Sequence, residues 1–268
     1  MKPGYPIIES QSKQLHALLA VLAASFLLLA CAVSASAAIA PGKTPTTPKL
    51  PEVEPPKPQL LIFHGGSFLF EDQFLEPSTV ARAIAAGFEP HYVEYPLGNL
   101  PAALDTARAE AKRLRLKYGK TYVYAYGASA GGTLATLLAG EGLVSAAAAK
   151  APVTDLATWE WPLAQYGANY YEQIGLTQED RTRFSPIDRP VKSPVLIYQG
   201  RADNVVPASM NEAFAATSEN VRYWSVPGGH ATDQARPWLI GRSLDWLART
   251  AAGQARKAAR GSILHTTP

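Results

Sequence analysis

The stretch VYAYGASAGGTLATLLAG, residues 123–140, changes from a strand-like pattern to a helical one through a short run of small residues. A sharp turn from strand to helix needs residues without bulk, because its backbone is strained and neighbouring elements crowd it. Three glycines supply that freedom, namely Gly127, Gly131 and Gly132. The stretch therefore predicts that the hydroxyl of Ser129 stands at the tip of the turn, beside the helix N-terminus that begins at Ala130.

Short apolar or β-rich runs alternate with helical patterns along most of the chain. We expect strands at 59–63, 90–95, 121–126, 145–150, 194–199 and 221–226, and helices at about 75–86, from 101, at 130–140, at 207–218 and at 233–249. This alternation favours a mostly parallel sheet with helices on both faces. The run at 145–150 is the least typical strand, since alanine favours helix. Residues 152–192 are rich in Trp, Tyr and Pro and predict a cap insertion over the carboxyl edge of the sheet.

Length and composition predict one folded domain over residues 59–250. The chain has 268 residues, of which 47% are hydrophobic and 18% are charged, so it can bury a full core. The formal net charge of +3 is small, and we expect no nucleic-acid partner. Cys31 is the single cysteine, so we predict neither an internal disulfide nor a cysteine metal site. Residues 251–268 are expected to form a disordered basic tail.

The first 40 residues predict a signal peptide or a membrane anchor. An apolar run ends in ASA at Ala37, the small-x-small pattern that signal peptidase recognises. Cleavage there competes with lipidation of Cys31, because LLAC resembles a lipobox, and with an uncleaved span. The protein is thus expected to be secreted or extracytoplasmic, with Cys31 or an N-terminal helix as a possible membrane tether. Residues 41–58 are dense in proline and predict an extended linker.

A serine hydroxyl is a poor nucleophile at neutral pH, so Ser129 needs a base, an orienting acid and donors for an oxyanion. Each is available at the end of an expected strand. The base and the acid are His230, in VPGGHATD, and Asp203, in YQGRADNVVP. Two glycines in FHGGSF, residues 63–68, allow backbone amides to turn inward.

The order Ser129, Asp203, His230, with HGG ahead of them, resembles the α/β-hydrolase superfamily, and within it the esterases and lipases that carry an HGG oxyanion loop. The resemblance covers residues 59 to about 249. It implies an α/β-hydrolase fold with about six mostly parallel strands, helices on both faces and a small cap. It also implies that Ser129 is the nucleophile, His230 the general base and acid, and Asp203 the orienting carboxylate.

The resemblance implies oxyanion donors as well. These are the amides of Ala130 and Gly66, with Gly65 and Ser67 as open alternatives. Two departures from the family pattern bear on this assignment. Ser67 stands where many such esterases have a third glycine, and the two leading strands usual in the superfamily are replaced by the proline-rich segment.

Other polar and aromatic residues have structural alternatives to a functional role. We expect His64 to brace the loop by hydrogen bonds rather than to transfer protons. Asp155 is expected to cap a helix, with a displaced triad acid as the alternative. Candidate substrate contacts are Ser67 in the HGG loop and, in the cap, Trp159, Trp161, Tyr166, Tyr170 and Tyr171. Aromatic residues in a cap more often only pack it shut.

The sequence thus predicts a serine hydrolase that cleaves a small-molecule carboxylic ester through an acyl-enzyme, with no cofactor and no metal. A serine peptidase of the prolyl-oligopeptidase kind has the same core but usually carries a further large domain. An acyltransferase would use the same residues and differ only in the acceptor. A non-catalytic binding protein on this scaffold would normally have lost one of the three residues.

Overall fold

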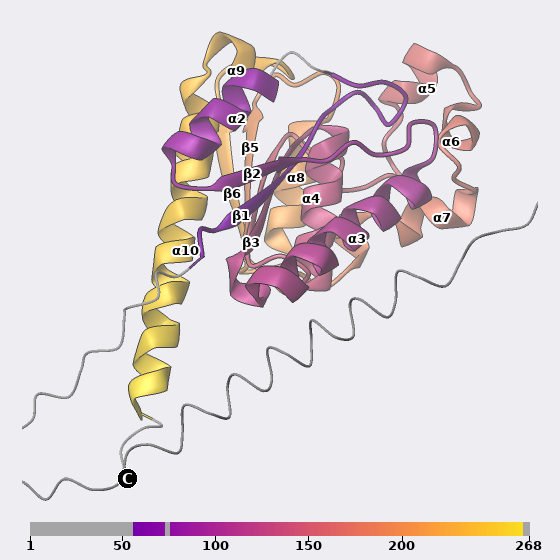
Figure 1. The fold of residues 1–268 in the computed structure, drawn as a ribbon. Helices are drawn as coiled ribbons and strands as arrows, with labels where there is room; N and C mark the ends of the chain where they lie inside the picture. The colour runs from indigo at the N-terminus through magenta and orange to yellow at the C-terminus, as the bar shows by residue number, and fades with distance from the viewer. Residues whose placement is uncertain (1–55, 73–75, 265–268) are drawn as a thin grey trace, which may run out of the picture. The chain divides into compact units, whose positions relative to one another are not determined.

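The computed structural model describes residues 56–72 and 76–264 (Figure 1). The predicted export or anchor segment and residues 41–55 of the predicted linker lie outside the described residues. Ala37 and Cys31, where cleavage and lipidation are predicted, also lie outside the described residues. None of the helices in the described part of the chain has both the length and the apolarity required to cross a membrane.

Six strands form one sheet in the order β2-β1-β3-β4-β5-β6, and every pairing is parallel. This confirms the α/β-hydrolase fold class. In chain order the strands are β1 (Gln59–Phe63), β2 (Glu89–Tyr92), β3 (Val123–Ala128), β4 (Ala147–Lys150), β5 (Val195–Gly200) and β6 (Val221–Val226). All carboxyl ends therefore lie at the same edge of the sheet, where parallel sheets bind their ligands.

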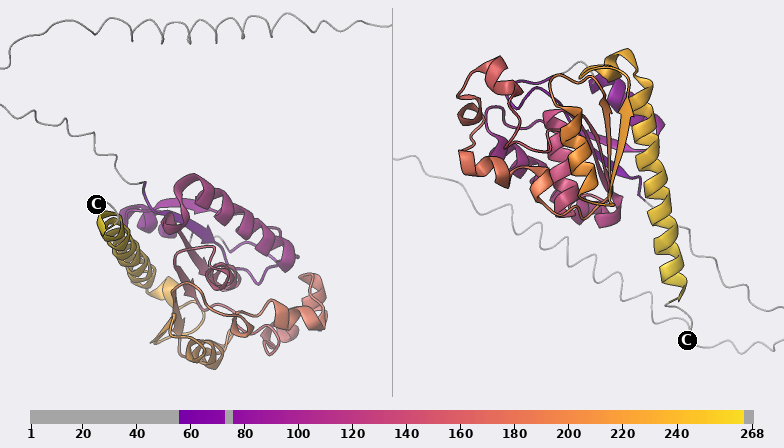
Figure 2. Two further views of the ribbon diagram at one scale, coloured as in Figure 1. Left: turned by 90° about the horizontal axis from the view of Figure 1, so that it is seen from below. Right: turned by 180° about the vertical axis from the view of Figure 1, so that it is seen from behind.

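Helices cover both faces of the sheet. One hydrophobic cluster joins one face to α3 (Leu100–Tyr118), α4 (Ala130–Glu141) and α8 (Ala208–Ala216). A second cluster joins the other face to α2 (Glu76–Ala85) and α10 (Trp238–Leu264). Figure 2 shows these two layers from below and from behind. Successive residues of a central strand alternate between the clusters, so the strands are apolar on both sides.

The alanine run forms β4 because of its neighbours. Ala148 lies between Tyr126 of β3 and Leu196 of β5, and Ala147, Ala148 and Ala149 are fully buried. The large side chains of the flanking strands fill the space on either side, so packing outweighs the preference of alanine for helix.

The predicted cap, residues 152–192, lies between β4 and β5. It contains α5 (Trp161–Tyr166), α6 (Tyr170–Gln173), α7 (Gln178–Arg183) and a 3₁₀ turn (Pro186–Asp188). Its aromatic residues pack against each other and against the larger core cluster. In Figure 1 the cap helices lie on the side of the sheet opposite to α10.

The disordered tail predicted for residues 251–268 is wrong for residues 251–264. Helix α10 continues through them to Leu264. The segment is rich in Ala, Arg and Lys, which are good helix formers. Gln254 also fixes the helix to the domain, since it accepts a hydrogen bond from the Tyr124 hydroxyl (2.8 Å) and donates to the Ser145 carbonyl (3.3 Å).

Candidate active site

Ser129 stands on the predicted turn between β3 and α4, in a strained backbone conformation with φ 51° and ψ −117°. Its amide donates to the carbonyl of Lys150 at the end of β4 (2.7 Å), which helps to hold that conformation. A Cβ on Gly127 would lie 2.1 Å from the Gly131 carbonyl oxygen, and one on Gly131 would lie 2.3 Å from that of His64. Only glycine fits at either position.

The structure brings the three predicted catalytic side chains together. Nε2 of His230 lies 3.2 Å from Oγ of Ser129, and Nδ1 of the same ring lies 2.9 Å from Oδ2 of Asp203. Ser129 follows β3, Asp203 follows β5 and His230 follows β6, so parallel strands deliver all three to the same edge. This is the geometry in which a carboxylate orients an imidazole that can accept the proton of a hydroxyl.

Asp203 is held as a buried carboxylate. Its Oδ1 accepts hydrogen bonds from the amides of Val205 and Val206 (2.9 Å each), and Gln199 donates to Oδ2 (3.2 Å). Burial alone would raise the pKa of Asp203. The hydrogen bond and charge interaction with His230, together with the two amides, outweigh that effect and lower the pKa. The carboxylate is therefore charged at neutral pH and can stabilise a protonated His230.

The HGG loop, residues 64–68, lies directly beside the nucleophile. A Cβ on Gly65 would lie 3.6 Å from Cβ of Ser129. The loop has positive φ angles at Gly66 (111°), Ser67 (54°) and Phe68 (60°), and a Cβ on Gly66 would lie 1.9 Å from the Phe70 carbonyl oxygen. Glycine at 66 therefore allows a backbone turn that brings the loop against the serine.

Ala130, the other predicted donor, is the first residue of α4. The first amides of a helix have no carbonyl partner within it. The amide of Ala130 is therefore free of the helix's own hydrogen bonding, next to the Ser129 hydroxyl and at the positive end of the helix dipole. The N-terminus of α4 and the HGG loop thus both lie next to Ser129.

His64 braces the HGG loop. Its Nδ1 lies 2.6 Å from the carbonyl oxygen of Gly65, and its ring stacks on Tyr95 at 4.1 Å. The Tyr95 hydroxyl in turn donates to the His64 carbonyl (2.8 Å). The base in contact with Ser129 is instead His230.

Asp155 lies outside the triad. Its Oδ1 accepts hydrogen bonds from the amides of Ala157 (2.9 Å) and Thr158 (3.2 Å). It therefore caps the turn that follows it, because its side-chain oxygen accepts hydrogen bonds from nearby amides in place of a backbone carbonyl. The acid position beside His230 belongs to Asp203.

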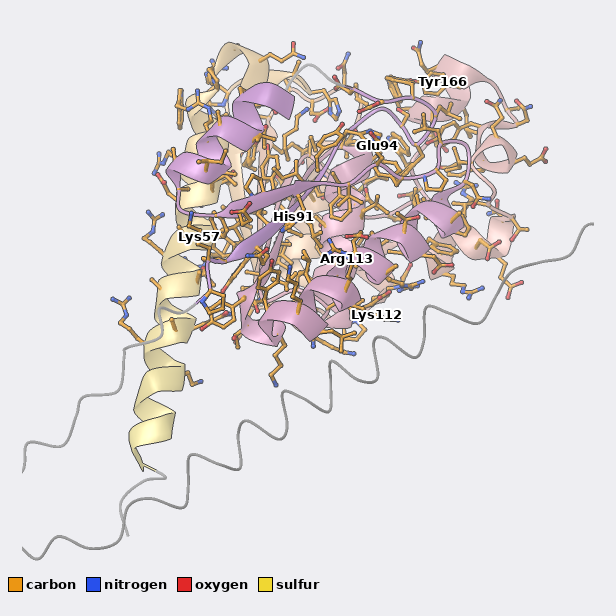
Figure 3. All side chains as sticks on the ribbon, in the orientation of Figure 1. Lys57, His91, Glu94, Lys112, Arg113 and Tyr166 are labelled. Atoms are coloured by element: carbon orange, nitrogen blue, oxygen red, sulfur yellow. The ribbon has the colours of Figure 1, made fainter. Side chains whose placement is uncertain are left out.

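The aromatic residues of the cap divide into buried and partly exposed ones. Trp159 is 1% exposed and donates its indole N–H to the Val205 carbonyl (2.7 Å), so the expectation that it contacts substrate is corrected. It packs the cap onto the loop that carries Asp203. Trp161 and Tyr166 on α5 are partly exposed, and Figure 3 labels Tyr166 on this part of the cap. The Tyr166 hydroxyl donates to Oγ of Ser67 (3.4 Å).

Two further candidates, Tyr170 and Tyr171, are buried, so both take the structural alternative and pack the cap instead of facing a substrate. The Tyr170 hydroxyl donates to the Ser67 carbonyl (2.9 Å), and that of Tyr171 donates to the Trp159 carbonyl.

Sequence reasoning missed Tyr95 and Lys150 as supports of the site. The one available signal concerned Lys150, which ends a run of alanines in an expected strand. A charged side chain at such a buried position needs a partner of opposite charge. Among the described residues, no cluster of His, Cys, Asp and Glu is arranged to hold a metal ion.

Comparison with known proteins gives a family and a fold. The model of the Prolyl oligopeptidase family matches residues 108–251, a range that includes Ser129, Asp203 and His230. Two Mycobacterium tuberculosis proteins, from strains CDC 1551 / Oshkosh and ATCC 25618 / H37Rv and described as uncharacterized, are each 34% identical over 109 residues. These matches cover 39% of this chain and 36% of each relative, so the chain spans about a third of the relatives' length.

Solved structures with the same fold include several enzymes. An acetyl ester-xyloside bifunctional hydrolase from Caldicellulosiruptor lactoaceticus aligns with a TM-score of 0.63 and 16% identity, over 80% of this chain and 92% of that one. A truncated carbohydrate esterase from gut microbiota gives 0.62 and 18%, over 75% and 88%. The carboxylesterase EstE1, cloned from a metagenomic library, gives 0.61 and 19%, over 75% and 82%. At these identities the likeness shows a shared fold.

Proposed function

The chain belongs to the prolyl oligopeptidase family, and on that premise we propose that it is a serine hydrolase that cleaves carboxylic esters through an acyl-enzyme. The observation that carries the proposal is the continuous hydrogen-bonded chain from Ser129 Oγ through His230 to Asp203, with distances of 3.2 Å and 2.9 Å. The strained backbone of Ser129, held at φ 51°, is a further support, because such strain concentrates at functional sites.

In the first half of the reaction, Oγ of Ser129 bonds to the ester carbonyl carbon while Nε2 of His230 takes the hydroxyl proton. Asp203 keeps the remaining ring proton on Nδ1 and stabilises the imidazolium. The amide of Ala130 and amides of the HGG loop donate to the carbonyl oxygen as it becomes negative. The intermediate collapses when the bond to the alcohol oxygen breaks and His230 passes its proton to that oxygen.

The second half regenerates the enzyme. Water attacks the acyl carbon, His230 removes a proton from the water, and the carboxylic acid leaves as Oγ of Ser129 recovers its proton from His230. An alcohol acceptor in place of water would give acyl transfer by the same steps.

Carboxylic esters are the substrates best supported, because the solved structures that share the fold include a carbohydrate esterase and an acetyl ester-xyloside hydrolase. Membership of the prolyl oligopeptidase family favours a second candidate, hydrolysis of peptides. Esters are chemically easier to cleave than amides, so activity on an ester alone does not exclude a peptidase.

The test is a panel of p-nitrophenyl esters with acyl chains of increasing length, run beside aminoacyl p-nitroanilides on the purified protein and on Ser129→Ala. We expect ester turnover that Ser129→Ala abolishes, and anilide turnover that is slower by orders of magnitude. Comparable kcat/KM values on both panels would establish the peptidase. Absence of turnover and of fluorophosphonate labelling in folded protein would favour a binding protein.

We further propose that the protein works outside the cytoplasm. The support is the apolar N-terminal run and the ASA pattern that ends at Ala37. Mass spectrometry of the mature protein distinguishes the three fates. A new N-terminus after Ala37 indicates signal-peptide cleavage, a diacylglyceryl mass on Cys31 indicates a lipoprotein, and an intact N-terminus indicates either an anchored or an unprocessed chain.

A further inference from the structure

The HGG loop is held in place through its carbonyl groups. Every carbonyl from residue 64 to residue 68 accepts a hydrogen bond. Side chains bind three of them: the His64 carbonyl accepts from Tyr95 Oη, the Gly65 carbonyl from His64 Nδ1, and the Ser67 carbonyl from Tyr170 Oη. Backbone amides supply the rest, from Asp72 to the Gly65 carbonyl, from Leu69 and Phe70 to the Gly66 carbonyl, and from Gly98 to the Phe68 carbonyl. In a trans peptide group the C=O and the N–H point in opposite directions. Each carbonyl shares its peptide plane with the N–H of the next residue, so the carbonyls of His64 to Ser67 fix the amides of Gly65 to Phe68 in turn.

This loop needs such support because part of its backbone is strained. Ser67 and Phe68, which are not glycines, have φ angles of 54° and 60°. A residue with a Cβ pays roughly 1–2 kcal/mol for this region of φ. The conformation persists only when surrounding contacts hold it. The peptide group between Ser67 and Phe68 lies at the centre of this strain, and its carbonyl is the one that Tyr170 binds.

Tyr170 is suited to this task by its burial. It comes from α6 in the cap, is fully buried, and places its hydroxyl 2.9 Å from the Ser67 carbonyl oxygen. Burial raises the pKa of Tyr170, so the hydroxyl stays protonated and donates at any ordinary assay pH. Its ring stacks on Tyr166, whose own hydroxyl reaches Oγ of Ser67. Two cap tyrosines thus converge on one residue of the loop.

We propose that Tyr170 is a positioning residue, which holds the HGG loop in the shape that receives the oxyanion and so makes the cap part of the catalytic apparatus. This inference rests on the proposed ester hydrolysis. Because the loop amides interact most strongly with the negative oxygen of the tetrahedral intermediate, loss of the Tyr170 hydroxyl weakens transition-state binding more than ground-state binding. The effect falls on kcat and leaves KM nearly unchanged.

The test compares Tyr170→Phe with Tyr171→Phe. Both remove one buried hydroxyl that donates to a backbone carbonyl, but Tyr171 binds Trp159 within the cap. We expect kcat on p-nitrophenyl acetate to fall roughly 10- to 100-fold in Tyr170→Phe, less than the roughly 10²–10³-fold cost of deleting an oxyanion donor. Affinity for an arylboronic acid, which mimics the tetrahedral intermediate, should fall in proportion. Tyr171→Phe should stay within about twofold of wild type in both measurements.

Hydrogen–deuterium exchange supplies a readout that needs no turnover. Amides of the HGG loop should exchange faster in Tyr170→Phe than in Tyr171→Phe or wild type. Equal exchange in the two variants, equal kcat in the two variants, or a rise in KM with unchanged kcat would each overturn the role of Tyr170. A wild-type protein that neither turns over esters nor reacts with a fluorophosphonate contradicts the proposed function instead, while the exchange experiment still decides whether Tyr170 holds the loop.

Discussion

Lys150 and Asp233 form a buried ion pair, with Nζ and Oδ1 3.6 Å apart and side chains that are 6% and 0% exposed. Lys150 ends β4, and its carbonyl accepts the amide of Ser129. Asp233 lies on α9 (Thr232–Ala235), just after His230. The pair therefore connects the segment that holds the nucleophile to the segment that carries the base.

Breaking this pair from one side should destabilise the fold strongly. Lys150→Met leaves the Asp233 carboxylate buried without a counter-charge, which typically costs about 3–5 kcal/mol in the free energy of unfolding. The double variant Lys150→Met/Asp233→Leu should recover most of that loss, and urea denaturation measures both. Arg108→Met is the control, because its ion pair with Glu141 is partly exposed and exposed pairs contribute about 1 kcal/mol or less. A single variant no less stable than this control would contradict the prediction.

Replacing Ser129 by Ala should abolish ester turnover and fluorophosphonate labelling while the thermal unfolding midpoint stays close to wild type. The hydroxyl takes part in the chemistry and contributes little packing. Triad members act as a unit, so His230→Ala should lose activity to a similar residual level, and the double variant should lose little more than either single one. Multiplicative losses in kcat would show that Ser129 and His230 act independently.

Asp203→Asn should change both activity and the pH dependence of stability. The folded pKa of Asp203 is lowered, so ionised Asp203 contributes stability that is fully present above the unfolded pKa of about 3.9 and is lost as pH falls through the folded value. We expect a shallower loss of stability below pH ~5 in the variant, measured by denaturation at several pH values. Turnover at neutral pH should fall by up to about 10⁴-fold, because Asn favours the wrong tautomer of His230.

Gly131→Ala should destabilise the protein by several kcal/mol. A Cβ there would lie 2.3 Å from the backbone oxygens of Phe63 and His64, and backbone atoms cannot turn aside as a flexible side chain can. The matched control is Gly253→Ala, since a Cβ on Gly253 in α10 meets nothing within 4 Å. That change should stabilise the helix by about 0.5–1 kcal/mol. Calorimetry on the two variants compares the same added methyl group at a crowded and at an open site.

Much of the architecture could be predicted because the local patterns agree with the fold. The alternation of apolar strands and helical segments indicated a parallel sheet, and such a sheet brings Ser129, Asp203 and His230 to one edge whatever their separation along the chain. Expectations based on local composition were wrong where contacts with residues distant in the sequence determine the structure. Residues 251–264 are helical partly because Gln254 reaches Tyr124 and Ser145. Trp159 is buried because Val205, from a distant loop, accepts its indole N–H. Neither partner is visible in the local sequence.

The order of the sheet also has a consequence for how the protein acquires activity. Every strand pairing is parallel, so each joins segments separated by a long crossover, and folds dominated by such pairings form slowly. His230 follows β6, the last strand in the chain and one edge of the sheet. The base can therefore reach Ser129 only after β3, β4, β5 and β6 have paired, and the HGG loop, which follows β1, is in place only after β1 has paired with β3. In a refolding experiment, ester turnover should appear with the slowest phase, later than the return of helical circular dichroism, so that hydrolysis reports the completion of folding.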